Sequence, residues 1–231
     1  MAQVVTEVQG GKGMLEVRNV KVYDLEESII ACRNAMRTEL PEYTQEEFEQ
    51  SLERAKKLAR TKTGSGHQTF LSGIRVSFDL IYPNYISPEL QRYHWVDIVT
   101  SASKMHRLMD MGLDMVCNKY VTKSMIEEMQ VHIAKYKAIK EDKEDNIYLW
   151  EMRDGSYHKT ETKEDSLYFA FMRCISNCPQ GIELFMRVST NYLQLKNIYH
   201  QRKHHKLKED WIDGFCVDFI EQLPYFQDFI L

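Results

Sequence analysis

Residues 67–104 constrain the fold of this chain more than any other stretch of the sequence. Within this segment apolar and polar residues alternate, with Ile74, Val76, Phe78 and Leu80 in the apolar positions. A period of two predicts a strand with one buried face. A helix start precedes this strand. A turn bounded by Pro83, a short helix ending in Arg92-Tyr93-His94 and a serine-rich stretch ending in Lys104 follow it.

The remaining patterns predict one domain over residues 1–231, with an α/β (α+β) fold in which helices flank a mixed or antiparallel sheet. The alternation over residues 15–23 slips by one residue, as a bulged strand would. Thr44 and Glu47 have the spacing of a capping box. Residues 140–163 are charged and are interrupted by Asp154-Gly155, which predicts an inserted exposed loop or hairpin. Helices are expected at 24–37, 44–60, 124–139, 163–177, 190–202 and 207–222.

Composition excludes several classes of protein. A net charge of −4 argues against a dedicated nucleic-acid binder. No apolar run reaches the ~18 residues of a membrane span, and the N-terminus lacks a signal-peptide pattern. The five scattered cysteines favour reduced thiols in the cytoplasm. Cys174 and Cys178 are four residues apart, but no second pair has metal-site spacing, so we expect no metal site.

The central segment resembles the core of the flavin-dependent thymidylate synthases. That family has a His-x-Thr-x-Phe-Glu-His element, a strand, a proline, an Arg-His-Arg triplet and a Ser-x-Arg end. Counted back from Arg92 without a gap, His67, Thr69 and Pro83 fall on the family positions. The resemblance implies that Thr69, Arg92 and His94 contact FAD. On spacing alone, His67 fits better as part of an ordinary loop-to-helix cap.

Several residues of this segment depart from the family pattern: Ser72, Gly73, Glu89, Tyr93 and Ala102. Ala102 stands where the family serine lies over the pyrimidine, and a shift of one residue would let Ser101 or Ser103 supply the hydroxyl. Lys104 keeps a cation at the arginine position, and the resemblance implies that it holds the nucleotide phosphate. Near the N-terminus, Arg33 is similar to a family arginine, with Ala35 where a flavin-contacting serine would be.

A second stretch, residues 186–202, resembles the family helix Asn-Ala-Arg-(x3)-Asn-Phe-Leu-x-Leu-Arg, with Phe185 in place of the leading asparagine. The positions that match are Arg187, Asn191, Leu195, Lys196 and His200. As a helix, this stretch would place Arg187 and Asn191 on one side of an apolar arc and Lys196 and His200 on the other.

The resemblance implies roles for these residues. Lys196 would hold the nucleotide phosphate, with Arg173 as a further candidate, and the other four positions would contact FAD. Without the resemblance, Arg187 and Asn191 read as a solvent-exposed edge, and Lys196 and His200 as a surface pair.

Together the two stretches imply a divergent member of the family. Such an enzyme converts dUMP to dTMP by reductive methylation, with methylenetetrahydrofolate and NADPH as co-substrates and reduced FAD as the hydride source. This methyltransferase chemistry requires no protein nucleophile, so we assign no catalytic residue. The resemblance further implies a cytoplasmic homotetramer that acts in nucleotide biosynthesis. Two alternatives stay open: a non-catalytic relative that binds nucleotide or flavin, and an enzyme with altered one-carbon chemistry.

Overall fold

The computed structural model describes residues 14–62, 64–142 and 148–231, which form two compact units. The first unit contains the described residues up to Tyr82 together with Ile86–Ser101 and Phe185–Leu231. The second contains Pro83–Tyr85 and Ala102–Leu184. No helix in the described part of the chain is long and apolar enough to cross a membrane.

The main sheet has four strands in the order β1-β2-β6-β3. Strand β1 pairs antiparallel with β2, and β3 pairs antiparallel with β6. The predicted bulge in β1 is confirmed, because the register shifts between Arg18 and Lys21, and Asn19 has a φ of 51°. The strand predicted in the central segment is also confirmed, as β2. The bounds are β1 Glu16–Tyr23, β2 Arg75–Pro83, β3 Asp97–Ser101 and β6 Glu183–Asn191.

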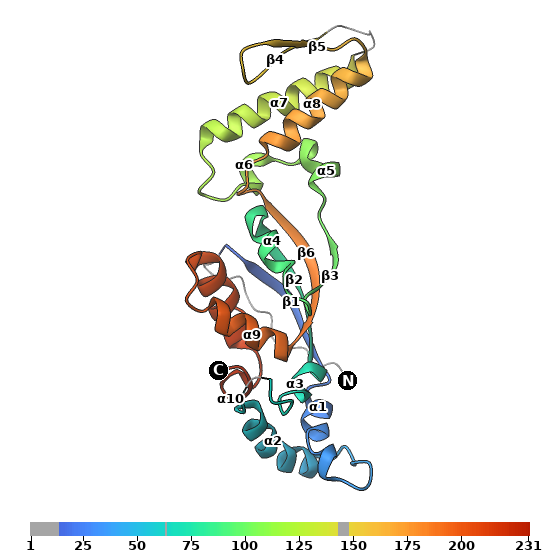
Figure 1. Cartoon of the computed structure of the whole chain (residues 1–231), viewed down its shortest axis with the longest axis vertical. Coiled ribbons are helices and arrows are strands. Elements are labelled where there is room, and N and C mark those ends of the chain that lie inside the picture. Colours follow the sequence, from blue (N-terminus) through green and yellow to red (C-terminus); the bar gives the residue numbers. More distant parts are fainter. Residues whose placement is uncertain (1–13, 63, 143–147) are drawn as a thin grey trace. The chain divides into compact units, whose positions relative to one another are not determined.

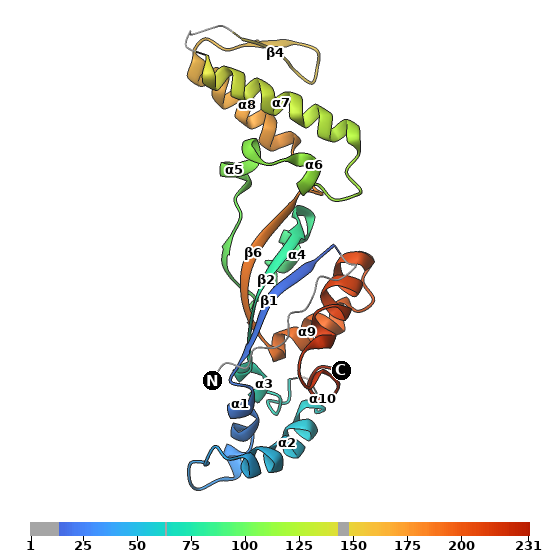
Figure 2. The ribbon, with the colours of Figure 1, turned by 180° about the vertical axis from the view of Figure 1, so that it is seen from behind.

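Helices of the first unit pack on this sheet and around its ends (Figures 1 and 2). The predicted cap is confirmed, since Thr44 Oγ1 accepts a hydrogen bond from the Glu47 amide at 3.2 Å. The helix expected over 24–37 ends early. The Cys32 amide is shared between carbonyls four and three residues back, the Arg33 amide bonds only three residues back, and a 3-10 turn follows. The helices are α1 Leu25–Ala31, η1 Asn34–Met36, α2 Gln45–Ala59, α3 Phe70–Gly73, α4 Ser87–Leu90, α9 Tyr192–Arg202, π-helix η4 Lys208–Val217, η5 Ile220–Gln222 and α10 Phe226–Phe229.

The core of the first unit lies between the apolar face of the sheet and the C-terminal helices. Phe78 in β2 is 1% exposed, and its ring lies 6.0 Å from Phe215 and 4.7 Å from Phe219. Trp211 is fully buried beside Phe215. The alternating apolar residues of β2 therefore face these aromatic rings, as the period of two predicted.

The helix expected through 186–191 is wrong, because these residues belong to strand β6 and α9 begins only at Tyr192. Met186, Val188 and Thr190 are buried, while Arg187 and Ser189 between them are partly exposed. This alternation has the period of a strand. Arg187 and Asn191 therefore do not share a helical face.

The second unit is built on two long helices, α7 and α8, which contact each other. Their facing side chains bury Met129, Ile133 and Cys174 in one core cluster. The hairpin expected within 140–163 is confirmed as β4 paired with β5, although residues 143–147 lie outside the described part. The elements are η2 Asn84–Ile86 (shared with the first unit), α5 Lys104–Arg107, η3 Leu108–Asp110, α6 Leu113–Val116, α7 Lys123–Glu141, β4 Leu149–Glu151, β5 Tyr157–Lys159 and α8 Lys163–Asn177.

Candidate functional site

The first unit contains a cavity of about 870 Å³, which we call the cationic pocket. It is formed by α1, α2, α3 and the turn that precedes α3. Several residues that the family resemblance singled out lie here together, although they are far apart in sequence. The lining residues are Ser28, Ala31, Cys32, Arg33, Ala35, Met36, Gln50, Arg54, Leu58, Gly66, His67, Thr69, Phe70, Ser72 and Gly73.

The lining of this pocket is basic, because it includes Arg33, Arg54 and His67 and no acidic residue. Arg33 donates to Glu47 at 3.0 Å, which neutralises part of its charge. Among the described residues, Arg54 makes no hydrogen bond or ion pair. Burial raises the pKa of the Cys32 thiol, and the charges of Arg54 and Arg33 act against this shift. The pocket can therefore accept an anion.

A glycine turn forms one rim of the pocket. Gly64 and Gly66 have φ values of 85° and 80°, which side chains larger than hydrogen rarely adopt. The turn is closed by Thr69, whose Oγ1 donates to the Gly66 carbonyl at 2.5 Å. Gln68 holds the turn to α2 by donating to the Ala59 carbonyl at 2.8 Å. His67 and Thr69 are consequently held on the exposed rim.

Two departures from the family pattern have a local structural reason. A Cβ atom at Gly73 would lie 2.4 Å from Ser28 Oγ, so a larger residue here would displace the Ser28 hydroxyl, and glycine lets α3 approach α1 without that shift. Ser72 donates its hydroxyl to the Thr69 carbonyl at 2.6 Å, within α3. Both residues therefore serve the packing and hydrogen bonding of α3.

The basic triplet lies in the loop after α4, and the prediction that a helix would end in it is wrong, since α4 stops at Leu90. Arg92 and His94 are exposed, whereas Tyr93 between them accepts a hydrogen bond from Arg202 at 2.7 Å. Arg202 also donates to Glu89 at 2.7 Å. Arg202 is therefore hydrogen-bonded to both Glu89 and Tyr93, two residues that depart from the family pattern. These bonds hold the loop in which Arg92 and His94 are exposed.

Arg187 and Asn191 have partners within the first unit. Arg187 forms an ion pair with Asp79 at 3.1 Å and donates to the carbonyl of Asn19, in the β1 bulge. Asn191 caps α9 by accepting from the Gln194 amide at 2.9 Å. Leu195, one turn further along α9, is fully buried in the core. None of the three lines the cationic pocket.

Lys196 and His200 contact the C-terminal segment. The Lys196 ammonium donates to the carbonyls of Ala59 at 2.7 Å and Phe229 at 3.0 Å, and the residue is only 8% exposed. Burial lowers the pKa of Lys196. His200 Nε2 lies 3.0 Å from the Ile230 carbonyl, and burial lowers the pKa of its imidazole as well. Among the residues that the structure describes, Lys196 therefore pairs with no carboxylate, and its ammonium satisfies two backbone carbonyls.

The remaining predicted site residues fall in different units. Ser101 is exposed at the end of β3 in the first unit. Ser103 and Lys104 lie at the start of α5, and Arg173 lies in α8, all in the second unit. No cluster of three or more His, Cys, Asp or Glu side chains that could hold a metal ion occurs in the described ranges.

The sequence patterns did not single out Arg54 or Gln50, which line the cationic pocket from α2. Both lie on the helix face that turns toward α1, but no motif marks that face. Arg54 lies three residues after the buried Ser51 and four before the buried Leu58, and Gln50 lies four before Arg54, which are offsets found in any amphipathic helix. Only the contact of α1 with α2 reveals them.

Comparison with solved structures identifies the fold. The chain is similar to the flavin-dependent thymidylate synthase ThyX from Helicobacter pylori complexed with FAD and dUMP, with a TM-score of 0.57 and 12% identity over 90% of this chain and 94% of that chain. A second structure of the same enzyme with FAD and dUMP gives a TM-score of 0.55 and 11% identity over 90% and 93%. Comparisons with protein-family models and with curated proteins find no match. The chain therefore has the ThyX fold, as the two motif-like stretches predicted.

Proposed function

We propose that this chain is a divergent flavin-dependent thymidylate synthase-like enzyme that binds FAD in the cationic pocket and methylates dUMP. The observation that carries the proposal is the pocket itself. The chain has a ThyX fold, and the pocket brings together Arg33 and Thr69, two residues that align with family positions. Its lining contains basic residues and no acidic ones. The solved ThyX structures contain FAD and dUMP.

The lining residues fit a diphosphate-bearing cofactor. Arg54 has an uncommitted guanidinium group, which suits two phosphate oxygens at once. His67 and the backbone amides of the glycine turn lie on the same rim, where they would donate to phosphate. Bound FAD would supply the hydride that the reaction requires. The protein groups around it orient the cofactor and exclude water.

Arg92 and His94 are the candidates for completing the flavin site, because they are exposed and held outward by the Glu89–Arg202 network. Neither lines the cationic pocket of the same protomer. A second copy of the chain in a homotetramer would bring the two sets together. We keep four further residues as proposed flavin contacts: Arg187, Asn191, Leu195 and His200. To contact the flavin, the three polar ones would have to exchange bonds that they already make within the chain.

For the nucleotide, the candidates are Ser101 or Ser103 near the base and Lys104, Arg173 or Lys196 at the phosphate. Methylenetetrahydrofolate would be the one-carbon donor, and NADPH the reductant, in a cytoplasmic reaction. Lys196 is the weakest of these, since two backbone carbonyls already accept from its ammonium.

A second candidate function is a non-catalytic relative that binds flavin or nucleotide. The bonds of Lys196 and His200 to backbone carbonyls favour it, because both positions would be ligands in an active family member. The alanine at 102 favours it as well, since the hydroxyl expected over the pyrimidine is missing. An enzyme with altered one-carbon chemistry would be distinguished by analysing the product formed from labelled dUMP.

The test is an absorbance scan of the purified full-length chain. The enzyme hypothesis expects a yellow protein with roughly stoichiometric flavin absorbance near ~450 nm. Arg54→Ala should lower the flavin content, while Lys57→Ala, an exposed cation on the same helix outside the pocket, should not. A flavin-loaded chain that forms dTMP supports the enzyme. A colourless chain that binds dUMP supports the non-catalytic relative, and a chain that binds neither refutes both.

A further inference from the structure

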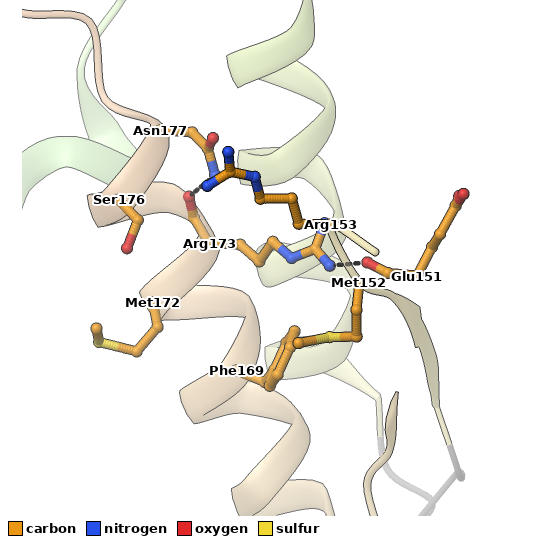
Figure 3. A pocket seen from close by; sticks show the side chains of 8 residues that line it. All are labelled: Glu151, Met152, Arg153, Phe169, Met172, Arg173, Ser176 and Asn177. Carbon is orange, nitrogen blue, oxygen red and sulfur yellow. Dashed lines mark hydrogen bonds between the residues drawn. The ribbon is translucent and has the colours of Figure 1, made fainter. Parts of the chain in front are cut away.

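Two cavities of the chain differ in what lies behind their aromatic lining residue. In the second unit, Phe169 lines a cavity of about 560 Å³ beside α8 (Figure 3), and its ring lies 4.8 Å from that of Trp150 in β4. In the first unit, Phe70 lines the cationic pocket, and its ring lies 5.6 Å from that of Phe229. Phe229 belongs to α10, a helix of only four residues. One wall of the cationic pocket therefore depends on a short helix.

Phe70 lies between the cationic pocket and α10. Phe70 is partly exposed, whereas Phe229 is fully buried. The two rings meet edge to face, with an angle of 85° between their planes, which is an arrangement that aromatic pairs favour. If Phe229 moved away, it would leave space behind Phe70 into which the Phe70 ring would retract. The pocket would then lose the wall against which a ligand packs.

A buried polar connection joins the same helix to the rim of the pocket. Lys196 donates to the Phe229 carbonyl at 3.0 Å and to the Ala59 carbonyl at 2.7 Å. The Ala59 carbonyl also accepts from the side-chain amide of Gln68 at 2.8 Å. Gln68 directly precedes Thr69, which lines the pocket. Helix α10 is therefore connected to the pocket twice, through the ring of Phe229 and through its carbonyl.

Opposing contributions decide how firmly α10 is docked. Phe226 and Phe229 are buried, which favours docking. Asp228 adds an ion pair with Arg60 at 3.3 Å, but water screens this pair because the Arg60 side chain is 69% exposed. Tyr225, which precedes the helix, has a φ of 55°, a left-handed conformation that strains a residue with a side chain. A single helical turn held against such strain opens more readily than the core.

We propose that α10 is a clamp on the cationic pocket. Its docking holds Phe70 and the rim in the arrangement that binds a ligand, and a ligand in the pocket in turn favours the docked helix. This reciprocity is a thermodynamic requirement once docking and binding are coupled. Phe229 contacts no ligand and acts through Phe70, so it is a positioning residue. The use of FAD as the ligand rests on the proposed function, whereas the connection of α10 to the pocket does not.

The first test is hydrogen exchange of α10 in the full-length parent chain, with and without FAD. The amides of Phe229 and Ile230 donate to carbonyls four residues back, so their exchange measures how often α10 opens. Saturating FAD should slow exchange of the peptide that contains them by about three-fold or more, and leave that of α8, in the second unit, unchanged. Bound FAD without any slowing in α10 would refute the clamp.

The second test needs no ligand. The Cys32 thiol is partly exposed and lines the cationic pocket, so the rate of its alkylation by iodoacetamide, followed by peptide mass spectrometry, measures access to the pocket. Phe229→Leu should raise this rate by about three-fold or more, since it loosens α10 and removes the support of Phe70. Phe215→Leu is the matched control and should leave the rate unchanged, because Phe215 is also buried but packs on Phe78 in the core, away from the pocket lining.

A double-mutant cycle tests whether the effect passes through the contact between Phe70 and Phe229. Phe70→Leu should raise the Cys32 rate by itself, and adding Phe229→Leu should then raise it by clearly less than Phe229→Leu does alone. Equal effects of Phe229→Leu and Phe215→Leu, or no effect of Phe229→Leu, would overturn the proposal. If the chain binds no FAD, the proposed function fails, and the Cys32 rates then decide whether α10 holds the pocket.

Discussion

The two stretches that resemble the thymidylate synthases differ in what their polar side chains do in the folded chain. In the central stretch, Arg92 and His94 are exposed, and among the described residues neither makes a hydrogen bond or ion pair. In the C-terminal stretch, Arg187 pairs with Asp79 and Lys196 bonds to two backbone carbonyls. The first set is available to a ligand, and the second set is already used by the fold.

This difference shows that residue spacing and residue availability are separate properties. Asn191 keeps the family spacing, yet its side chain caps α9. His200 keeps it too, yet its imidazole lies 3.0 Å from the Ile230 carbonyl. A match in spacing therefore indicates common architecture, whereas a ligand site also requires donors that the protein leaves uncommitted.

Replacing Lys196 should produce the largest effect on stability. Lys196→Ala leaves the Phe229 carbonyl without the ammonium that donates to it, and an unsatisfied buried group costs about 1–3 kcal/mol. The Ala59 carbonyl loses one donor but still accepts from Gln68. Relief of the buried charge offsets part of this cost, so we expect a loss of about 2 kcal/mol in the free energy of unfolding. Urea denaturation measures it, with Lys57→Ala as the exposed control, expected to change it by less than about 0.5 kcal/mol.

The opposite result would break the comparison between the two stretches. If Lys196→Ala unfolds at the same urea concentration as the parent chain but loses dUMP binding, then Lys196 is a ligand despite its burial. The C-terminal segment around Phe229 would then have to move away when nucleotide binds.

The sequence predicted the central strand and the cap of α2 well, because their signals are local. Alternation over 74–80 and the Thr44–Glu47 spacing each specify an element without distant contacts. The first part of the C-terminal stretch, residues 186–191, was mistaken for a helix because the whole stretch resembles a family helix. The competing alternation of Met186, Val188 and Thr190 was the better guide, since these three side chains are buried.

The cationic pocket was only partly predictable for a different reason. Thr69 could be predicted because it matches a family position. Arg54 matches none, and it lines the same pocket only because α1 and α2 pack together. The partners of Tyr93 and Lys196 likewise lie more than thirty residues away in sequence, at Arg202 and at Ala59 and Phe229. A single sequence contains no direct record of such distant pairings.

A smaller effect is expected at Asp79, where the ion pair with Arg187 can be tested by pH. Burial alone would raise the pKa of Asp79, but hydrogen bonds from Asn19 and Arg187 outweigh it and lower the pKa below its usual 3.8. The carboxylate therefore adds stability above pH 3.8, and this contribution is lost as the pH falls through the lower, folded-state pKa. Asp79→Asn should cost less than about 1 kcal/mol at pH 7, because the side chain is 39% exposed and water screens the pair.

Chemical denaturation of the parent chain and Asp79→Asn at pH 7 and at pH 3 measures this contribution. The two proteins should differ at pH 7 and converge in acid. A difference that is the same at both pH values would mean that the charge of Asp79 does not stabilise the β1 bulge. Arg187 would then be held only by its hydrogen bond to the Asn19 carbonyl, and its availability to a ligand would differ less from that of Arg92.

The smallest effect on stability, and the most direct test of availability, is expected at Arg92. Arg92→Ala removes an exposed side chain without a described partner, so the free energy of unfolding should change by less than about 0.5 kcal/mol. Flavin content should nevertheless fall several-fold, because a charge-assisted contact to a diphosphate is lost. Absorbance of the purified variant measures it, with Arg92→Lys as the variant that keeps the charge but not the bidentate geometry. Unchanged flavin content in Arg92→Ala would show that an uncommitted cation at a family position is still not a ligand, and that availability, like spacing, does not by itself define the site.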